Sequence, residues 1–542
     1  MELTLLLPGQ EARGLNRLPA VRTARAGKTR GQAVRIVWYD GPGHELAERG
    51  LVLARESGTK EQETREPGAR EPEGKETAAG ESGPWRLEQH RPDAAEAWPP
   101  GTDHRLIEAS AGPEPPPRPV PDTLAAMACF EGRRTVFSLA QDGAAVTMTL
   151  LDGVLRMGAA EHPATRLILN GPRGAVRSLA LALAAALTVS IPVESLAMEA
   201  RRLGDGTPPV PRRSGPPVLP PRAASPGTPL SATPPHGTPP SGTSPSGIFP
   251  SGTSPSGTSP SGALSTHAAF IHVLGHLTDV VLFLAAQVRE GRGEVEVVHQ
   301  MRVAVRRARS ALSLFRPVIL PSALSPAAEG LKDLGRMLGP ARDWDVFMTE
   351  TLPPVAAALP DQPALTGLLQ AGARRREEAR AALAAYLDSR AFRAICVELA
   401  CLAALEPEGE EGPPLTAFAV SVLRARWKKL RGTGKSLDAL DHSGLHALRL
   451  KAKRARYTAE FLVSLFPARP AARFIRRLSA VQEHLGVFND TAAAAALLRE
   501  MSGEPDVASG LVLGFTAARG AGILPRIGRS WRRLRRCAPF WE

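Results

Sequence analysis

Two stretches of the sequence carry histidine and basic residues at one spacing, His-x2-Arg-x3-Arg/Lys-x2-Arg. They are VVHQMRVAVRRARSALSLF (297–315) and GLHALRLKAKRARYTAEFL (444–462). At about 100° per residue in an α-helix, each set falls within an arc of about 80°. Guanidinium groups pair bidentately with phosphate and carboxylate oxygens, so each stripe predicts a site for a polyanion. The stripe residues are His299, Arg302, Arg306 and Arg309, and then His446, Arg449, Lys453 and Arg456.

The two stripes belong to an internal repeat. Corresponding residues lie 147 positions apart, as for His299 and His446. Farther along the chain, LGPARDWD (338–345) and LGVFNDTA (485–492) align at the same offset. Separate motifs that keep one register indicate a duplication rather than a similarity of composition.

Acidic residues accompany the repeated motif. Asp343 and Asp490 occupy equivalent positions in the two copies, and Asp345 follows closely in the first. Carboxylates near helix ends accept hydrogen bonds from free backbone amides or hold basic side chains in place. We expect helix capping at these positions rather than metal binding. Lys332 and Arg336, which precede the motif, would extend the basic site.

The elements that must position the stripes are helices. Apolar residues recur at i, i+3 and i+4 after residue 263, and strand patterns are absent there. Opposite the first stripe, four apolar residues would face a core: Met301, Val305, Ala308 and Leu312. We therefore predict an all-helical domain over 264–542. Its helical segments are 271–288, 297–314, 327–338, 365–387, 417–430, 445–465, 471–485 and 491–498.

Residues 1–205 predict an antiparallel β domain. Short segments rich in β-forming residues recur between Gly, Pro and Asp, among them VRIVWYD, AAVTMTLLDG and ATRLILNG. They are compatible with closure into a barrel or tunnel. A charged stretch over 57–83 predicts a long loop, and the apolar run over 179–193 predicts a buried helix rather than a membrane span.

A Pro/Ser/Gly-rich segment over 206–263 separates the two parts and predicts a disordered linker. The charge is distributed unevenly: residues 263–542 hold 39 Lys and Arg against 27 Asp and Glu, whereas residues 1–210 hold 25 against 27. An anionic partner should therefore contact the helical domain. The four cysteines show no metal or disulfide pattern, which fits a reducing cytoplasm.

The repeated segments resemble the CHAD family, the conserved histidine α-helical domain. The resemblance also covers VQEHLGVFNDTAAAAALL and the terminal WRRLRRCAPFW. It implies two pseudo-symmetric four-helix bundles whose basic surface binds inorganic polyphosphate. By motif position, the implied ligands are His299, Arg302, Arg306, Arg309, His446, Arg449, Lys453 and Arg456, with Lys332, Arg336 and Arg342 as further candidates.

The N-terminal part is similar to the CYTH family, chiefly in VWYDGPGHELAERGLVLARE, RRTVFSL and TMTLLDGVLRMG. That resemblance implies an eight-stranded antiparallel tunnel that hydrolyses triphosphates with a divalent metal held by inward carboxylates. The sequence departs from it, because Thr4 and Leu6 stand where the family has a glutamate and a lysine. The late strand ATRLILNG also lacks the usual glutamates. The remaining candidates are Glu2, Arg55, Arg134 and Asp152.

These features favour a polyphosphate-binding protein whose β domain lacks a full catalytic set and which holds no metal. The alternative is a metal-dependent inorganic triphosphatase that uses Mg²⁺ or Mn²⁺, with the helical part as an accessory domain. Nucleic acid fits less well, because Tyr457 is the stripes' aromatic neighbour and stacking platforms are lacking. We expect no membrane partner. The expected location is the cytoplasm, at polyphosphate granules if polyphosphate is the ligand.

Overall fold

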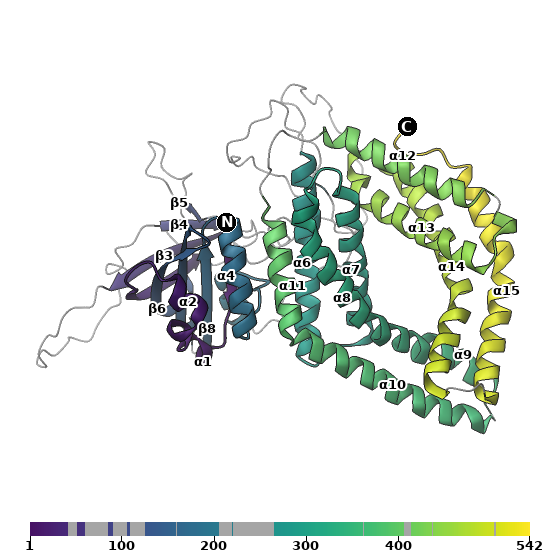
Figure 1. Ribbon diagram of the computed structural model, residues 1–542, viewed down its shortest axis with the longest axis horizontal. Helices are drawn as coiled ribbons and strands as arrows, with labels where there is room; N and C mark the ends of the chain where they lie inside the picture. Colours follow the sequence, from purple (N-terminus) through teal and green to yellow (C-terminus); the bar gives the residue numbers. More distant parts are fainter. Residues whose placement is uncertain are drawn as a thin grey trace, which may run out of the picture.

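A computed structural model describes residues 1–41, 51–59, 85–89, 106–108, 125–158, 160–204, 219, 265–360, 362–405, 413–435, 437–502 and 506–542. The predicted loop over 57–83 and the predicted linker over 206–263 lie almost wholly outside these residues. The described chain forms a β domain followed by a helical domain (Figure 1). The predicted fold class, an antiparallel β domain joined to a duplicated helical domain, is confirmed.

The β domain is built on one eight-stranded sheet in the order β1-β8-β7-β6-β2-β3-β4-β5. All neighbouring strands are antiparallel. Within the described residues, the end strands β1 and β5 do not pair with each other. The strands are β1 (Glu2–Leu6), β2 (Arg30–Asp40), β3 (Leu51–Thr59), β4 (Trp85–Gln89), β5 (Leu106–Glu108), β6 (Ala125–Gln141), β7 (Ala144–Met157) and β8 (Ala160–Asn170).

Alternate side chains on each strand point to opposite sides of the sheet, and both sides carry apolar residues. Helices therefore cover both faces. On one side, the α4 face, helix α4 (Arg173–Ala186) joins the core that contains Leu5 and Met148. On the other side, the α5 face, helix α5 (Leu196–Gly204) packs in a cluster with Phe130 and Leu151. The buried helix expected over 179–193 is α4, although it ends at Ala186. Short helices α1 (Gly9–Ala12) and α2 (Pro19–Ala24) follow β1.

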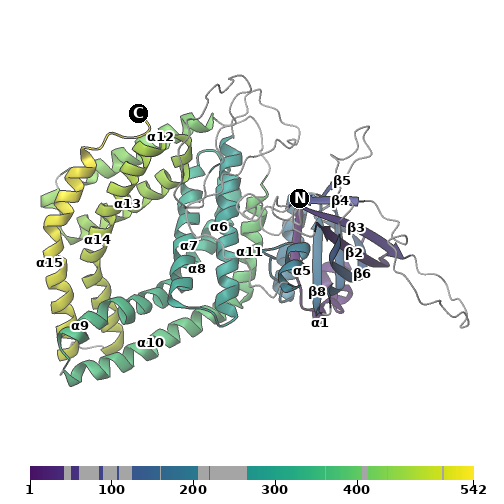
Figure 2. The same ribbon diagram turned by 180° about the vertical axis from the view of Figure 1, so that it is seen from behind.

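The helical domain contains two copies of a four-helix unit. Helices α7 (Val295–Phe315) and α13 (His442–Leu462) begin 147 residues apart, as do α8 (Pro321–Val346) and α14 (Ala468–Ser502). The duplication seen in the sequence therefore extends to helix boundaries. The other members are α6 (Thr266–Arg289) and α10 (Pro363–Leu387) in the first copy, and α12 (Leu415–Thr433) and α15 (Val507–Arg535) in the second. Figures 1 and 2 show the first copy beside the β domain.

The predicted helical segments all lie in helices, and the two segments over 471–485 and 491–498 are parts of α14. Three helices of the helical domain were not predicted: α9 (Leu352–Ala358), α11 (Arg390–Ala403) and α15. A π-helical turn over Phe347–Thr351 separates α8 from α9, whereas α14 continues without a break. The two copies thus differ just beyond their Leu-Gly motifs.

The β domain and the helical domain share one hydrophobic core, because α4 packs against α11. Arg177 of α4 donates to Glu398 of α11 at 2.8 Å, and the Nε of Arg173 donates to the Cys401 carbonyl at 2.9 Å. Leu219, a described residue of the predicted linker segment, is fully buried in the same core. The two domains are therefore held together by buried apolar surface as well as by the chain.

Two helices of the described chain are long and apolar enough to cross a membrane, by length and composition only: α6 and α15. In α6, 83% of the apolar window is buried inside the protein, as expected for a core helix. In α15 the buried share is 28%, and this helix packs mainly on α14.

Candidate functional site

The two basic stripes meet where α7 packs against α13. Tyr457 of α13 is buried there, and its ring lies 5.8 Å from the guanidinium of Arg307 and 5.5 Å from that of Arg456. As predicted, the apolar positions of α7 are buried on the opposite side. The sequence folds this way because each helix alternates a basic face with an apolar one at 3.6-residue spacing.

Five cations from the two helices converge into what we call the central cation cluster. Its members are Arg302 and Arg306 of α7, and Arg449, Lys453 and Arg456 of α13. Each of Arg306, Arg449 and Lys453 is perturbed by charges on the partner helix as well as on its own. Both copies of the repeat therefore contribute to one site.

This cluster is held partly out of water, which is costly for like charges. Burial, and then the neighbouring Arg449 and Arg306, lower the pKa of Lys453 from its ordinary value to about 7. Burial also lowers the pKa values of Arg306 and Arg449. Titratable groups perturbed by burial and by specific neighbours are typical of functional sites. A bound anion would stabilise all five cations at once.

Two carboxylates stand at equivalent positions beside the cluster. Asp343 of α8 lies 3.5 Å from Arg302, and burial raises the pKa of its carboxyl group. Asp490 of α14 faces Arg449 and Arg519, yet burial raises its pKa to about 6. A third carboxylate, Glu460, lies 3.4 Å from Arg456 but is shared with Arg307. Three carboxylates therefore stand near the five cations of the cluster.

The predicted capping role of the aspartates is wrong, because none of them lies at the N-terminus of a helix, where backbone amides are free. Asp343 and Asp345 are within α8, and Asp490 is within α14. Asp345 is fully buried, where it accepts from Arg376 of α10 at 2.7 Å and from Arg380 at 3.1 Å. Its role is to fasten α10 to α8.

The other predicted ligands lie at the border of the cluster or away from it. His299 is partly buried, and burial with nearby Arg342 lowers its pKa, so it is neutral near pH 7. Arg309 and His446 are exposed on the same helices. Lys332 and Arg336 are exposed on α8, and Arg336 pairs with Asp333 one turn away. The structure does not bring these last two into the cluster.

Gly339 of the Leu-Gly motif gives Arg302 room. A Cβ atom at this glycine would lie 3.2 Å from Nη1 of Arg302. Any larger residue would therefore push the guanidinium aside. In the sequence, Gly339 indicates only the repeat. Arg519 and Glu460 were not predicted as site residues, because neither belongs to the His-x2-Arg-x3-Arg/Lys-x2-Arg pattern.

The CYTH-like candidates of the β domain fall on opposite sides of the sheet. The registers Leu6↔Arg166↔Leu151↔Arg134 put Arg134 on the side of Leu6 and therefore of Glu2, the α5 face. Asp152 and Arg55 come one residue out of phase and lie on the other side. Arg134 is paired with Glu56, and Asp152 accepts from Thr165 at 2.7 Å. The structure does not gather them into one site.

The α5 face is filled by apolar side chains and a buried ion pair. Arg166, which is 1% exposed, donates to Glu199 of α5 at 2.8 Å. Thr4 on the same face is fully buried. No three His, Cys, Asp or Glu side chains of the described residues gather where they could share a metal ion. The residues described here do not fit the inward carboxylate set that a metal-dependent triphosphatase needs.

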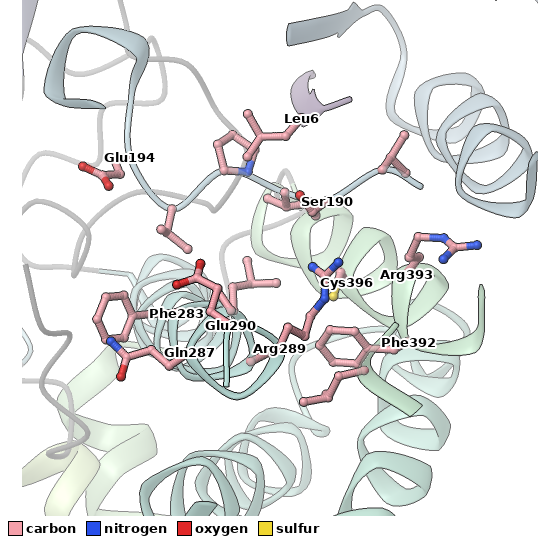
Figure 3. Close-up of a pocket in the computed structure, with 18 of the residues that line it drawn as sticks. Leu6, Ser190, Glu194, Phe283, Gln287, Arg289, Glu290, Phe392, Arg393 and Cys396 are labelled. Atoms are coloured by element: carbon pink, nitrogen blue, oxygen red, sulfur yellow. The ribbon is translucent and has the colours of Figure 1, made fainter. Parts of the chain in front are cut away.

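A cavity of about 420 Å³ lies between the two domains (Figure 3). It is lined by segments near Ser190, by the end of α6 and by α11. Several of its charges are paired, as Arg289 is with Asp388 at 2.5 Å and Arg202 with Glu194 at 2.8 Å, and Arg393 donates to the carbonyl oxygens of Ala184 and Asp388. In this pairing of charges the cavity differs from the central cation cluster. We interpret it as a gap at the domain interface rather than as an anion site.

Residues 272–499 match the family model described as the CHAD domain, so this part of the chain is a CHAD domain. Two curated relatives are the uncharacterized proteins MT2285 and Rv2226 of Mycobacterium tuberculosis, strains CDC 1551 / Oshkosh and H37Rv. Each is 31% identical over 178 residues. The alignment covers 30% of this chain and 34% of each relative, about a third of their length.

Solved structures include the CHAD domain from the plant Ricinus communis, 29% identical over 50% of this chain and 92% of that chain, with a TM-score of 0.42. PptA from Streptomyces chartreusis is 17% identical over 49% of this chain and 99% of its own, with a TM-score of 0.39. HpAC1 from Hippeastrum, for which a dominant triphosphatase activity is described, is 12% identical over 38% of this chain and 96% of its own. Its TM-score is 0.24, so the CYTH resemblance remains a prediction.

Proposed function

We propose that this CHAD-domain protein binds inorganic polyphosphate at the central cation cluster. The observation that supports the proposal is the convergence of five cations from both repeats, with only three carboxylates of the described residues (Asp343, Asp490 and Glu460) beside them. A single phosphate or carboxylate would engage only part of such a cluster. A linear phosphate polymer presents closely spaced charges that can pair with several guanidinium groups together.

The same geometry argues against nucleic acid as the preferred polyanion. Tyr457, the aromatic residue nearest the cluster, is 3% exposed and its ring faces cations of the protein itself. It therefore offers no platform on which a base could stack. Phosphate contacts alone would not distinguish RNA from polyphosphate, but the denser charge of polyphosphate favours it.

In this proposal the protein binds polyphosphate but does not hydrolyse triphosphates. On the α5 face, Arg134 pairs with Glu56 and Arg166 pairs with Glu199, and apolar side chains pack around them. Asp152 and Arg55 lie on the opposite face. Hydrolysis of a triphosphate would require carboxylates that converge on a metal ion. A cytoplasmic location accords with polyphosphate as ligand and is part of this proposal.

The proposal is tested on the full-length protein, because the two domains share one core. We expect tight binding of polyphosphate that RNA displaces poorly, and no release of phosphate from tripolyphosphate with Mg²⁺ or Mn²⁺. The double variant Arg302→Gln/Lys453→Gln should bind at least about ten-fold more weakly, because two charge-assisted contacts of about 1.5–3 kcal/mol each are lost.

A matched control removes two exposed cations of the β domain, Arg13→Gln/Arg17→Gln. It lowers the net charge equally but leaves the cluster intact, so its affinity should stay within about two-fold of the wild type. Equal weakening of both variants would mean that overall charge, and not the cluster, attracts the polymer. Metal-dependent phosphate release that Glu2→Gln abolishes would instead support the triphosphatase alternative.

A further inference from the structure

A second basic surface lies on α15, outside the predicted stripes. Five arginines follow one side of this helix within an arc of about 100°, and they span roughly 25 Å at 1.5 Å per residue. All five are exposed. We call this surface the α15 arginine stripe: Arg519, Arg526, Arg529, Arg533 and Arg536.

No acidic residue compensates this stripe along its own helix. The segment from Val507 to Arg535 contains no Asp or Glu. Within the described residues, none of the five arginines makes an ion pair with a carboxylate at 4 Å or less. Exposed arginines elsewhere do pair, as Arg336 does with Asp333. An unpaired row of this length is a surface with a strong positive potential.

The neighbouring helix adds to the same surface. Arg477 of α14 donates through Nη1 to the carbonyl of Arg533 at 2.6 Å, which places its guanidinium against the stripe. His484 of α14 contacts Ser530 at 3.2 Å, so the two helices run side by side along this stretch. Arg473, about one turn before Arg477, and Arg476, the residue directly before it, are also exposed.

The stripe begins near the central cation cluster. A Cβ atom at Gly520 of α15 would lie 3.5 Å from Oγ1 of Thr491 in α14, so Arg519 and Asp490 are neighbours on adjacent helices. Asp490 also interacts with Arg449 of the cluster. From Arg519 the stripe runs along α15 toward the C-terminus. A polymer bound at the cluster could therefore extend past Asp490 to Arg519 and onto the stripe.

We propose that the α15 arginine stripe is a second binding segment that holds the continuation of a long phosphate polymer beyond the central cation cluster. The inference rests on the proposed function and makes chain length a determinant of affinity. The ligand class is a linear polyanion without aromatic groups, because the tryptophan of this segment, Trp531, is buried and donates to the Gly434 carbonyl. The stripe can therefore offer ion pairs but no stacking to its ligand.

The test compares long-chain polyphosphate with tripolyphosphate on the full-length protein. The variant Arg526→Gln/Arg529→Gln/Arg533→Gln/Arg536→Gln should bind the long chain at least about ten-fold more weakly and with a smaller salt dependence. Its affinity for tripolyphosphate should not change, because a short chain fits within the cluster. The four side chains are exposed, so the melting temperature should stay the same.

The matched control removes four exposed cations of the β domain, Arg13→Gln/Arg17→Gln/Arg22→Gln/Lys28→Gln, and should bind both ligands like the wild type. Three results would overturn the inference: equal weakening by the control, equal loss for both chain lengths, or unchanged affinity for the long chain. Loss of binding to vesicles with anionic lipids, with polyphosphate affinity intact, would assign the stripe to a membrane instead. If the wild type binds neither phosphate ligand, the proposed function itself fails.

Discussion

Arg307 of α7 and Glu460 of α13 form an ion pair of 3.1 Å across the two repeats, with side chains that are 9% and 11% exposed. Their counterparts 147 residues away are Arg454 and Ser313, so the second half of this symmetric pair lacks its carboxylate. Arg426 of α12 contacts Ser313, and burial, followed by the nearby charge of Arg454, lowers its pKa. The duplication has therefore kept the cations on both sides and a carboxylate on only one.

The Arg307–Glu460 pair should be a principal contact between the repeats. Glu460→Gln removes the carboxylate that the nearly buried Arg307 shares with Arg456 at 3.4 Å, and should lower the free energy of unfolding by about 3 kcal/mol. Denaturant unfolding of the full chain measures this. Ser313→Ala, at the symmetric position, is the control and should change stability by less than about 0.5 kcal/mol. Equal effects would show that the pair has no special role.

The central cation cluster should reduce the stability of the free protein. Lys453→Met removes a partly buried charge from among four arginines, so the free energy of unfolding near pH 7 should rise by about 1–2 kcal/mol while polyphosphate binding weakens. The gain should shrink as the pH rises from 7 toward the ordinary lysine pKa, because folded Lys453 is then neutral. A loss of stability in this variant would indicate a structural role for the lysine.

Binding should take up a proton above pH 7. Lys453 has a pKa of about 7 in the free protein, and a bound polyanion raises it, so affinity should fall as the pH increases from 7.0 to 8.5, by up to about ten-fold per pH unit. Below pH 7 this lysine is already charged and contributes no further dependence. Asp490, with its pKa of about 6, contributes in the same direction at lower pH.

The matching variant is Lys453→Arg, which stays charged throughout this range. Titrations with polyphosphate at constant ionic strength should show a flat affinity from pH 7.0 to 8.5 for the variant and a falling one for the wild type. A wild-type affinity independent of pH would place Lys453 outside the binding site.

The sequence predicts the two basic faces of the site but not which of their residues come together. His299, Arg302 and Arg306 follow one helical face, and the 147-residue offset predicts an equivalent face on α13. Which cations become neighbours depends on how α7 and α13 pack, and these helices are far apart in the chain. The same limit applies to Arg519, since no motif marks a residue that reaches the site through tertiary packing alone.

The β domain shows why a motif can be found and still give no site. Glu2 and Asp152 both match CYTH-like positions, but the strand registers put them on opposite faces of the sheet. Register depends on the pairing of strands, and a shift of one residue reverses every side chain. Strand segments could be predicted from alternation, whereas the partners of Arg134 and Asp152 required the folded sheet.

The central claim is that cations from both repeats bind one phosphate polymer, and charge reversal on each helix tests it most directly. Binding of labelled polyphosphate to the full chain would be titrated for the wild type, Arg302→Glu, Arg449→Glu and the double variant. We predict that each single reversal weakens binding at least about ten-fold. The loss of binding free energy in the double variant should be smaller than the sum of the two single losses, because both residues act on the same ligand. Wild-type affinity in the double variant would contradict the account.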